Sequence, residues 1–248
     1  MIVDEKRLPR VVKAPEVRRK ELLAIARRLF MERGYDRVSV EDVIAEAGLS
    51  KGAFYYHFES KAALLEALTQ EFAAESIAQV RDILDDPSLN AFERLVGFLE
   101  RSRRLKAGQT PELLRVFEAI FRPENIALYH RAHAAVTTVM VPVMADIIQQ
   151  GIEEETFAVT DARTTAEILL QIATITHDVV AGLFTAADGE DTRRAIEAFE
   201  RRIVANGIAV DRILGLPDGS IAFIEPGLVE EMVTCRAAIR SEPAYIAG

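Results

Sequence analysis

A short segment of the chain carries side chains that could contact a nucleic acid. It reads SKGAFYYHFESK, residues 50–61, and contains Tyr55, Tyr56 and His57 in succession. Tyrosine and histidine hold hydrogen-bonding atoms on rigid stems, which can reach phosphate oxygens and base edges while covering apolar sugar surface. A solvated helix face would instead carry Glu, Lys and Gln. The alternative interpretation is that the tyrosines cover adjoining helices and leave their hydroxyls in water.

The same segment offers groups that suit phosphates. Gly52 lacks a side chain, so backbone N–H groups at a helix N-terminus could approach a phosphate closely. Lys51 and Lys61 could each neutralise a phosphate charge. Phe54 and Phe58 would share the opposite helix face, because residues four apart in a helix lie one above the other, and they would anchor the helix in a core.

Two short helices must position this segment. Ser39 is a predicted N-cap with Asp42 three residues later, close to a capping box, and the helix that it starts covers about 40–47. A second short helix begins after Ser50 and covers about 51–58. The connection AGLS contains a glycine, as the turn of a helix-turn-helix does. The sequence therefore predicts a helix-turn-helix whose second helix presents the polar residues.

The charge distribution is compatible with a polyanionic partner at one end of the chain. The net charge of −9 argues by itself against a nucleic-acid partner. Residues 1–60, however, carry 12 Lys and Arg against 10 Asp and Glu, whereas the remainder carries 18 against 29. A basic head on an acidic body can bind a polyanion locally while the body stays soluble. An ordinary solvated basic terminus explains the same charges equally well.

Helical periodicity dominates the chain and predicts an all-α fold of about nine or ten helices. We expect a flexible basic arm over 1–14, a three-helix DNA-binding domain over 15–62 and a helical body over 63–248, with a helix over 61–85 linking head and body. Further helices are expected at 88–106, at 110–122, from about 124 to a stop at Gly151, at 161–186, at 191–214 and at 226–240.

The composition indicates a soluble cytoplasmic protein with no membrane partner. Cys235 is the single cysteine, which excludes an internal disulfide framework and a multi-cysteine zinc site. No apolar run approaches the roughly 20 residues that span a bilayer. The first residues are charged and lack the apolar stretch of a secretory signal.

An all-α enzyme and a metal-binding bundle are the alternatives. Di-iron bundles need Glu-x-x-His pairs on facing helices, and no glutamate stands three residues before His130, His133 or His177. These three histidines could still form a metal site, although such residues are more often solvated or satisfied by a local hydrogen bond. We therefore expect no catalytic residue, no metal and no cofactor.

Over about residues 18–72 the sequence resembles the DNA-binding domain of the TetR family of transcriptional regulators. The resemblance is carried by AIARRLFMERGYDRVSVEDVIAEAGLSKGAFYYHFESKAALLEAL. It implies a repressor that binds a palindromic operator in double-stranded DNA and leaves it when a small, largely apolar effector binds the body. The residues that the resemblance assigns to DNA are Ser39 and Ser50 as caps that touch phosphates, Lys51, Gly52 and Ala53 near the bases, Tyr55, Tyr56 and His57 on phosphates, and Lys61 at the start of the next helix.

Ala53 departs from the family pattern, because many relatives carry a hydrogen-bonding side chain there. Its methyl group offers only apolar contact, for example to a thymine methyl. Base specificity would then depend mainly on Lys51 and on DNA shape.

The resemblance also implies a homodimer and an effector pocket. The dimer would form through the helices at 161–186 and 191–214, which combine apolar stripes with small residues; an intrachain core is the alternative. The pocket would mix aromatic rings, flexible methionines and a few polar groups. Its candidate residues, any of which could instead be plain core, are Phe98, Phe117, Phe121, Tyr129, His133, Met140, Met144 and His177.

Overall fold

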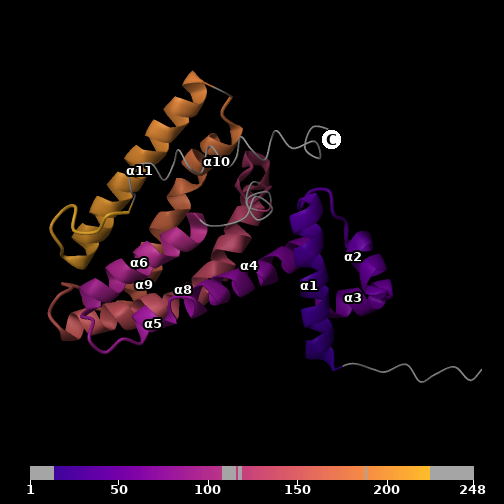
Figure 1. Ribbon diagram of the computed structural model, residues 1–248, viewed down its shortest axis with the longest axis horizontal. Helices are drawn as coiled ribbons and strands as arrows, with labels where there is room; N and C mark the ends of the chain where they lie inside the picture. The colour runs from indigo at the N-terminus through magenta and orange to yellow at the C-terminus, as the bar shows by residue number, and fades with distance from the viewer. Residues whose placement is uncertain (1–13, 108–115, 117–118, 188, 224–248) are drawn as a thin grey trace, which may run out of the picture.

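The computed structural model describes residues 14–107, 116, 119–187 and 189–223 (Figure 1). Within these ranges the secondary structure is helical, and no strand occurs in them. The predicted all-α class is therefore confirmed. The predicted arm before Ala14 and the helix at 226–240 lie outside the described residues, as does most of the helix at 110–122.

Three helices form the head at one end of the molecule: α1 (Pro15–Arg33), α2 (Val40–Ala47) and α3 (Lys51–His57). The Ser39 hydroxyl accepts a hydrogen bond from the Asp42 N–H at 3.1 Å, and the Asp42 carboxylate accepts one from the Ser39 N–H at 2.7 Å. This is the reciprocal capping box that the sequence predicts. Gly48 ends α2 in the left-handed conformation, with φ of 61°.

The helix that connects head and body is shorter than predicted. Helix α4 (Lys61–Ala78) starts at the Ser60 cap and runs from the head into the body, followed by the short α5 (Arg81–Leu84). The prediction of one helix over 61–85 is therefore wrong. The chain turns at Val80, whose side chain is fully buried in the core of the body.

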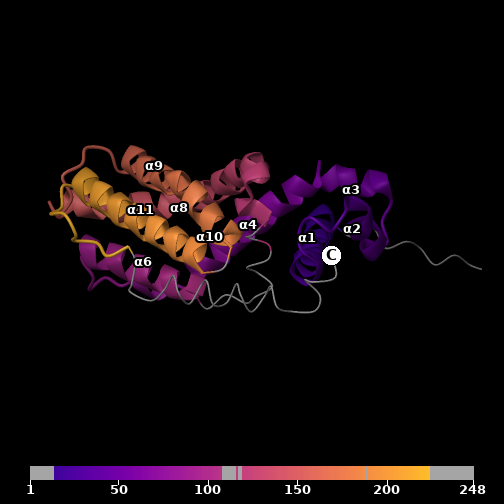
Figure 2. The same cartoon turned by 90° about the horizontal axis from the view of Figure 1, so that it is seen from above.

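The body contains α6 (Ala91–Ala107), the 3-10 turn η1 (Pro123–Asn125), α8 (Ile126–Glu153), α9 (Ala162–Ile172), the 3-10 turn η2 (Ala173–Thr176), α10 (His177–Thr185) and α11 (Glu190–Leu214). Helix α8 packs along both α4 and α9, and α10 packs beside α11 (Figures 1 and 2).

Two helix boundaries in the body differ from the prediction. Helix α8 passes through Gly151 and ends at Glu153, because the glycine makes room for a neighbouring ring: a Cβ at Gly151 would lie 2.0 Å from the Phe157 ring. The predicted helix over 161–186 is divided by η2 into α9 and α10.

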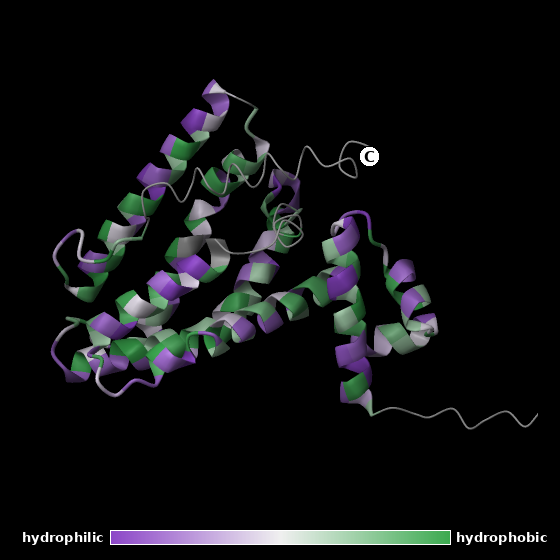
Figure 3. Ribbon diagram, viewed as in Figure 1, coloured by the Kyte–Doolittle hydropathy of each residue, from purple (hydrophilic) through white to green (hydrophobic). Residues whose placement is uncertain are grey.

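The described side chains form two hydrophobic cores. One lies in the head around Leu22, Phe30 and Phe54, and it also contains Ile120 and Tyr129 from the body. The other fills the body around Phe98, Ile147, Ile148 and Leu214. Figure 3 shows hydrophobic residues along α4, α8 and α9. Since the first core includes Leu64, Leu65 and Leu68 of α4, it extends past residue 62.

Two helical stretches, Pro123–Glu153 and Ala162–Thr185, are long and apolar enough to cross a membrane by length and composition alone. The expectation that no apolar run approaches this length is therefore too strong. Core helices of soluble proteins pass the same test, and the first stretch supplies Ile147 and Ile148 to the core of the body.

Candidate nucleic-acid interface and buried aromatic cluster

Helix α3 separates its aromatic side chains by face. Phe54 is fully buried and Phe58 is 4% exposed, whereas Tyr55 is 46% and Tyr56 75% exposed. The two phenylalanines anchor α3 in the first core. Both tyrosine rings consequently project from the head, as a surface that contacts another molecule would require.

Neighbouring rings hold the exposed tyrosines in place. The Tyr55 ring meets Phe54 edge to face, with centroids 5.3 Å apart, and the Tyr56 ring meets His57 in the same way at 4.9 Å. Edge-to-face contacts stabilise ring orientation. Because the rings are already oriented, less side-chain entropy would be lost on binding.

Gly52 lies on the exposed surface of α3 with empty space beside it. A Cβ added there would meet no heavy atom within 4 Å. Packing within the chain therefore gives no reason for a glycine at this position, although glycine weakens a helix relative to alanine. A close approach by an external partner, such as a phosphate, does give one.

Lys51 and the serines of this surface have partners within the head. The Lys51 ammonium lies 3.2 Å from the Glu41 carboxylate of α2, and both side chains are exposed. The hydrogen bond to Glu41 raises the pKa of Lys51. The Ser50 hydroxyl accepts the Ala53 N–H at 3.2 Å. Exposed ion pairs contribute little stability, so Lys51 can exchange Glu41 for a phosphate at small cost.

Lys61 differs from the other residues assigned to DNA. Its half-buried ammonium donates a hydrogen bond to the Tyr35 carbonyl at 3.0 Å and lies 4.1 Å from the centre of the Tyr35 ring. Burial lowers the pKa of Lys61 and, together with Asp36, raises that of Tyr35 to about 12. The structure thus gives Lys61 contacts inside the head, which the sequence did not indicate.

Half of the predicted effector residues lie together in the body. We call the ring cluster the group Phe121, Tyr129, His133, His177 and Phe184. Within it, Tyr129 lies 4.4 Å from His177, 5.3 Å from Phe121 and 6.1 Å from His133, centroid to centroid. Phe121 also stacks on Phe184 at 6.0 Å.

The other predicted effector residues do not join this cluster. Phe98 and Met144 are buried in the second core, and Met140 packs against it. Phe117 lies outside the described residues. Sequence reasoning missed Phe184, which joins the cluster through Phe121. It also missed Thr137, whose hydroxyl is buried without a hydrogen-bond partner; its position four residues after His133 places it on the same helix face.

The break at η2 positions His177. The Thr174 hydroxyl donates to the Gln171 carbonyl at 2.7 Å, and the Arg202 guanidinium of α11 donates to the Ile175 carbonyl and, at 3.3 Å, to Asp178. Threonine hydroxyls that bond to preceding carbonyls compete with regular helix. As a result His177 begins α10 as a buried residue.

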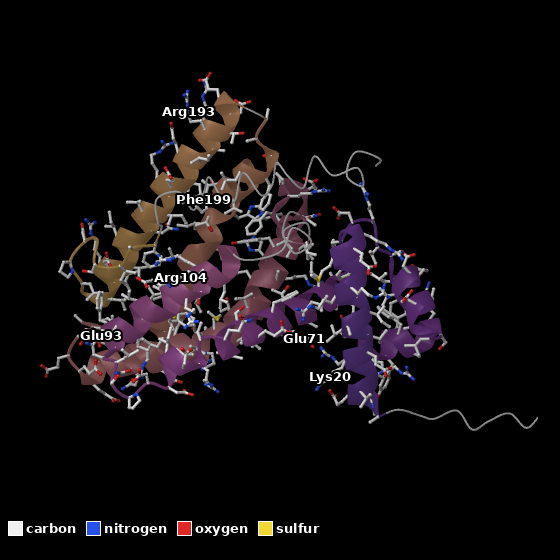
Figure 4. The ribbon with its side chains drawn as sticks, viewed as in Figure 1. Lys20, Glu71, Glu93, Arg104, Arg193 and Phe199 are labelled. Carbon is white, nitrogen blue, oxygen red and sulfur yellow. The ribbon has the colours of Figure 1, made fainter. Side chains whose placement is uncertain are left out.

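Helix α11 lies against the same region from the outside. Figure 4 shows Arg193 at the outer end of α11 and Phe199 on the side toward α10. This orientation agrees with the bond from Arg202, one turn further along, to the backbone of η2. Helix α11 therefore supports the wall that carries His177.

The ring cluster is joined directly to the head. Arg122, next to Phe121, forms an ion pair of 2.7 Å with Asp36 between α1 and α2. Tyr129 belongs both to the ring cluster and to the first core. On α8, Arg131 pairs with Glu66 of α4 at 2.6 Å. A displacement of residues 121–131 would consequently reach the head without passing along the whole of α4.

No group of three or more His, Cys, Asp or Glu side chains that could hold a metal ion occurs among the described residues. His133 and His177 each contact the ring of Tyr129. Nothing in the described geometry therefore favours the metal-binding alternative.

Two family models match the chain. Residues 22–68 match "Bacterial regulatory proteins, tetR family", and residues 115–201 match "Tetracyclin repressor-like, C-terminal domain". The first match contains α2 and α3, and the second contains the ring cluster. Together the two matches cover both regions described above.

Individual proteins are similar to parts of the chain. The HTH-type transcriptional repressor KstR2 of Mycobacterium tuberculosis is 37% identical over 95 residues, which are 38% of this chain and 47% of that protein. The chain thus spans about half the length of this curated relative. A crystal structure of a TetR-family transcriptional regulator from Pectobacterium atrosepticum is 26% identical, with a TM-score of 0.56, and covers 84% of this chain and 100% of its own. The structure of RolR in complex with resorcinol has a TM-score of 0.59 at 18% identity and covers 92% of this chain and 95% of its own, which shows a shared fold.

Proposed function

Because this chain belongs to the tetR family of bacterial regulatory proteins, we propose that it is a repressor that binds a palindromic operator as a homodimer. A small, largely apolar effector bound in the body would release it. Regulators of this kind are not enzymes and are in general soluble cytoplasmic proteins.

The observation that carries the proposal is the outward projection of Tyr55 and Tyr56 from an α3 that is anchored by Phe54 and Phe58. In helix-turn-helix proteins the second helix enters the major groove. A surface of tyrosines, Lys51 and an open glycine supplies phosphate donors and apolar contact there. These features support the DNA contacts that the sequence resemblance implies.

Exposed apolar residues of the body support dimerisation. Ile168 of α9, Ile175 of η2 and Val204 of α11 are each about half exposed, at 48%, 53% and 50%. The elements that carry them contact one another, and contiguous exposed apolar surface commonly marks a protein interface. We propose that the faces of α9–α11 pair with those of a second copy, which would place two heads on the two half-sites of an operator.

Effector release would use the contacts between body and head. The similar structure of RolR holds resorcinol. In this chain the ring cluster is a group of aromatic and polar residues that adjoins the contacts with the head. Filling it would displace Phe121 and Tyr129, and the Arg122–Asp36 pair would transmit the change. By linkage, operator binding would weaken effector binding by the same factor.

The proposal is tested by footprinting the purified full-length protein on DNA upstream of its own gene. We expect protection of a palindrome, with Tyr55→Ala weakening binding by about 1–3 kcal/mol and leaving the circular dichroism spectrum unchanged. Glu71→Ala, on α4 away from α3, is the control and should bind normally. The absence of any sequence-selective protection would contradict the proposed function.

A further inference from the structure

We propose that the ring cluster, together with Thr137, binds a neutral planar ring compound that carries a hydroxyl group. This inference rests on the proposed function, since it names the chemical class of the effector. Unpaired polar atoms, the arrangement of the rings and the absence of a free charge in the cluster each support it.

Three buried polar atoms at this place have no hydrogen-bond partner: His133 Nε2, Thr137 Oγ1 and His177 Nε2. His177 is the most enclosed of these residues, with 8% of its surface exposed. An unpaired polar atom in an interior costs free energy, so native proteins retain few of them without a role. A ligand with a polar group would supply the missing partner.

Two of the three residues lie against one ring. His133 and His177 contact Tyr129 at 6.1 Å and 4.4 Å between centroids. Thr137 follows His133 by four residues on α8, so its side chain lies one turn further along the same face. The unpaired atoms thus lie on one face of α8 and at the start of α10.

Other unpaired atoms in the described part of the chain are of a different kind. Arg94, Arg103 and Gln150 each have one, but each of these side chains donates a hydrogen bond through another atom. Each of these side chains is therefore partly satisfied, with one polar atom unpaired. For His133 and His177 the structure records ring contacts and no side-chain hydrogen bond.

Thr138 shows what a threonine in α8 does when no ligand is needed. Its hydroxyl donates to the Ala134 carbonyl at 3.0 Å, the usual bond of a helical threonine to the preceding turn. The hydroxyl of the adjacent Thr137 is buried and has no such bond. These two neighbours therefore form a matched pair for experiment.

The rings of the cluster favour a flat ligand. Phe121 is nearly parallel to His177, with 26° between the planes, and to Phe184, with 23°. Tyr129 is nearly parallel to His133, with 24° between the planes. A further planar ring can join such near-parallel rings in offset stacking. A flexible aliphatic chain would gain less from this geometry.

The polar atoms favour a neutral hydroxyl over a carboxylate. Burial lowers the pKa of both His133 and His177, and the nearby His130 lowers each further, while Asp178 opposes this at His177. Neutral imidazoles offer one donor and one acceptor each. Arg202, a cation that contacts this region, is already bound to the Ile175 carbonyl and to Asp178.

A hydroxyl group can donate and accept at once, which matches a neutral histidine and a threonine. A carboxylate would need a cation to offset the loss of its hydration. An apolar ring without a hydroxyl would fill the space but leave all three atoms unpaired. The order of affinities for three small compounds therefore tests the proposal.

Calorimetric titrations of the full-length protein with phenol, toluene and benzoate provide this order. We expect phenol to bind about tenfold more tightly than toluene, the effect of one satisfied hydrogen bond, and benzoate to bind more weakly than phenol. Equal affinity for phenol and toluene, a preference for benzoate, or no phenol binding at about 10 mM would overturn the proposal.

The variant that locates the site is Thr137→Val, which removes the hydroxyl and keeps the shape. We expect it to weaken phenol binding about fivefold to tenfold and leave toluene binding unchanged, while Thr138→Val retains the affinity of the unaltered protein. Equal phenol affinity in the two valine variants would remove Thr137 from the site.

Histidine NMR gives a second readout that does not depend on affinity. The chain has four histidines, so their ring signals can be assigned with single variants. Phenol should shift the signals of His133 and His177 and leave that of His57, on α3, in place. Shifts confined to other histidines would place the ligand elsewhere.

Operator binding, measured separately, distinguishes this inference from the proposed function. If phenol binds at Thr137 and His177 but no compound changes the operator affinity, the site is supported and effector-controlled release is rejected. If compounds release the operator but bind Thr137→Val as tightly as the unaltered protein, the proposed function is supported and this site is rejected.

Discussion

Gly52 is a residue whose exchange should separate stability from DNA binding. Because a Cβ there meets nothing within 4 Å, Gly52→Ala should raise the free energy of unfolding by about 0.5–1 kcal/mol through better helix propensity. The same methyl would stand between a phosphate and the start of α3, so operator affinity should fall by about tenfold or more. Urea denaturation and fluorescence anisotropy measure the two effects, and a variant that bound DNA normally would assign Gly52 no part in the interface.

Lys51 and Lys61 should respond differently to alanine substitution. Lys51 is exposed and should contribute about one unit of salt dependence to operator binding, which Lys51→Ala would remove. Lys61→Ala should leave that slope nearly unchanged and instead lower stability by about 1 kcal/mol, because its contacts with Tyr35 are lost. Operator titrations at several salt concentrations measure these slopes. A clear drop in the salt dependence of operator binding for Lys61→Ala would show that Lys61 contacts a phosphate.

Individual residues were predictable where local chemistry determines them. The capping box of Ser39 and Asp42 depends on neighbours three residues apart, and the burial of Phe54 opposite Tyr55 and Tyr56 follows from helical spacing. The contacts of Lys61 could not be predicted in this way, since its partner Tyr35 lies 26 residues away. Nothing in the spacing of lysines distinguishes an ammonium that meets a phosphate from one that meets a carbonyl.

Among the elements, the segment that links the ring cluster to the head should control coupling. Arg122→Gln should reduce the effector's influence on operator affinity by about 0.5–2 kcal/mol, because the ion pair with Asp36 is lost. Stability should change by less than about 1 kcal/mol, as for other exposed pairs. Operator titrations with and without effector measure the coupling. The control is Arg212→Gln on α11, which breaks an exposed ion pair with Asp218 of the following turn.

A charge exchange tests whether the pair itself matters. If Arg122→Asp combined with Asp36→Arg restores the effector response that each single change diminishes, the contact transmits the response. An undiminished response in Arg122→Gln would instead leave α4 as the route between body and head.

The sequence predicted that the helices exist, but it did not predict several of their boundaries. Gly151 reads as a stop by local rules, yet α8 continues because the glycine accommodates Phe157. The break at η2 lies in an apolar, β-branched stretch whose pattern stays helical, and Arg202 from another helix completes it. In both cases a side chain outside the helix concerned, Phe157 or Arg202, bears on the boundary.

At the scale of the whole molecule, the apolar face of α9–α11 should hold the dimer together. Ile168→Glu would place a carboxylate in that interface and should raise the dimer dissociation constant by at least about tenfold. Val17→Glu is a matched control, since Val17 is 49% exposed but lies on α1. Sedimentation measures the association state, and an unaltered dimer in Ile168→Glu would assign the interface elsewhere.

The shared core of head and body has a consequence for protein engineering. Ile120, Tyr129 and Ala132 belong to the same buried core as Leu22 of α1 and Leu64 of α4. A chimaera that fused residues 1–80 to the sensory half of another regulator would expose that surface to solvent and lose its packing. Transplants that also carry over residues 116–132 should yield soluble hybrids more often. Transfer of the DNA-binding specificity to another regulator therefore requires two segments that are separate in the sequence.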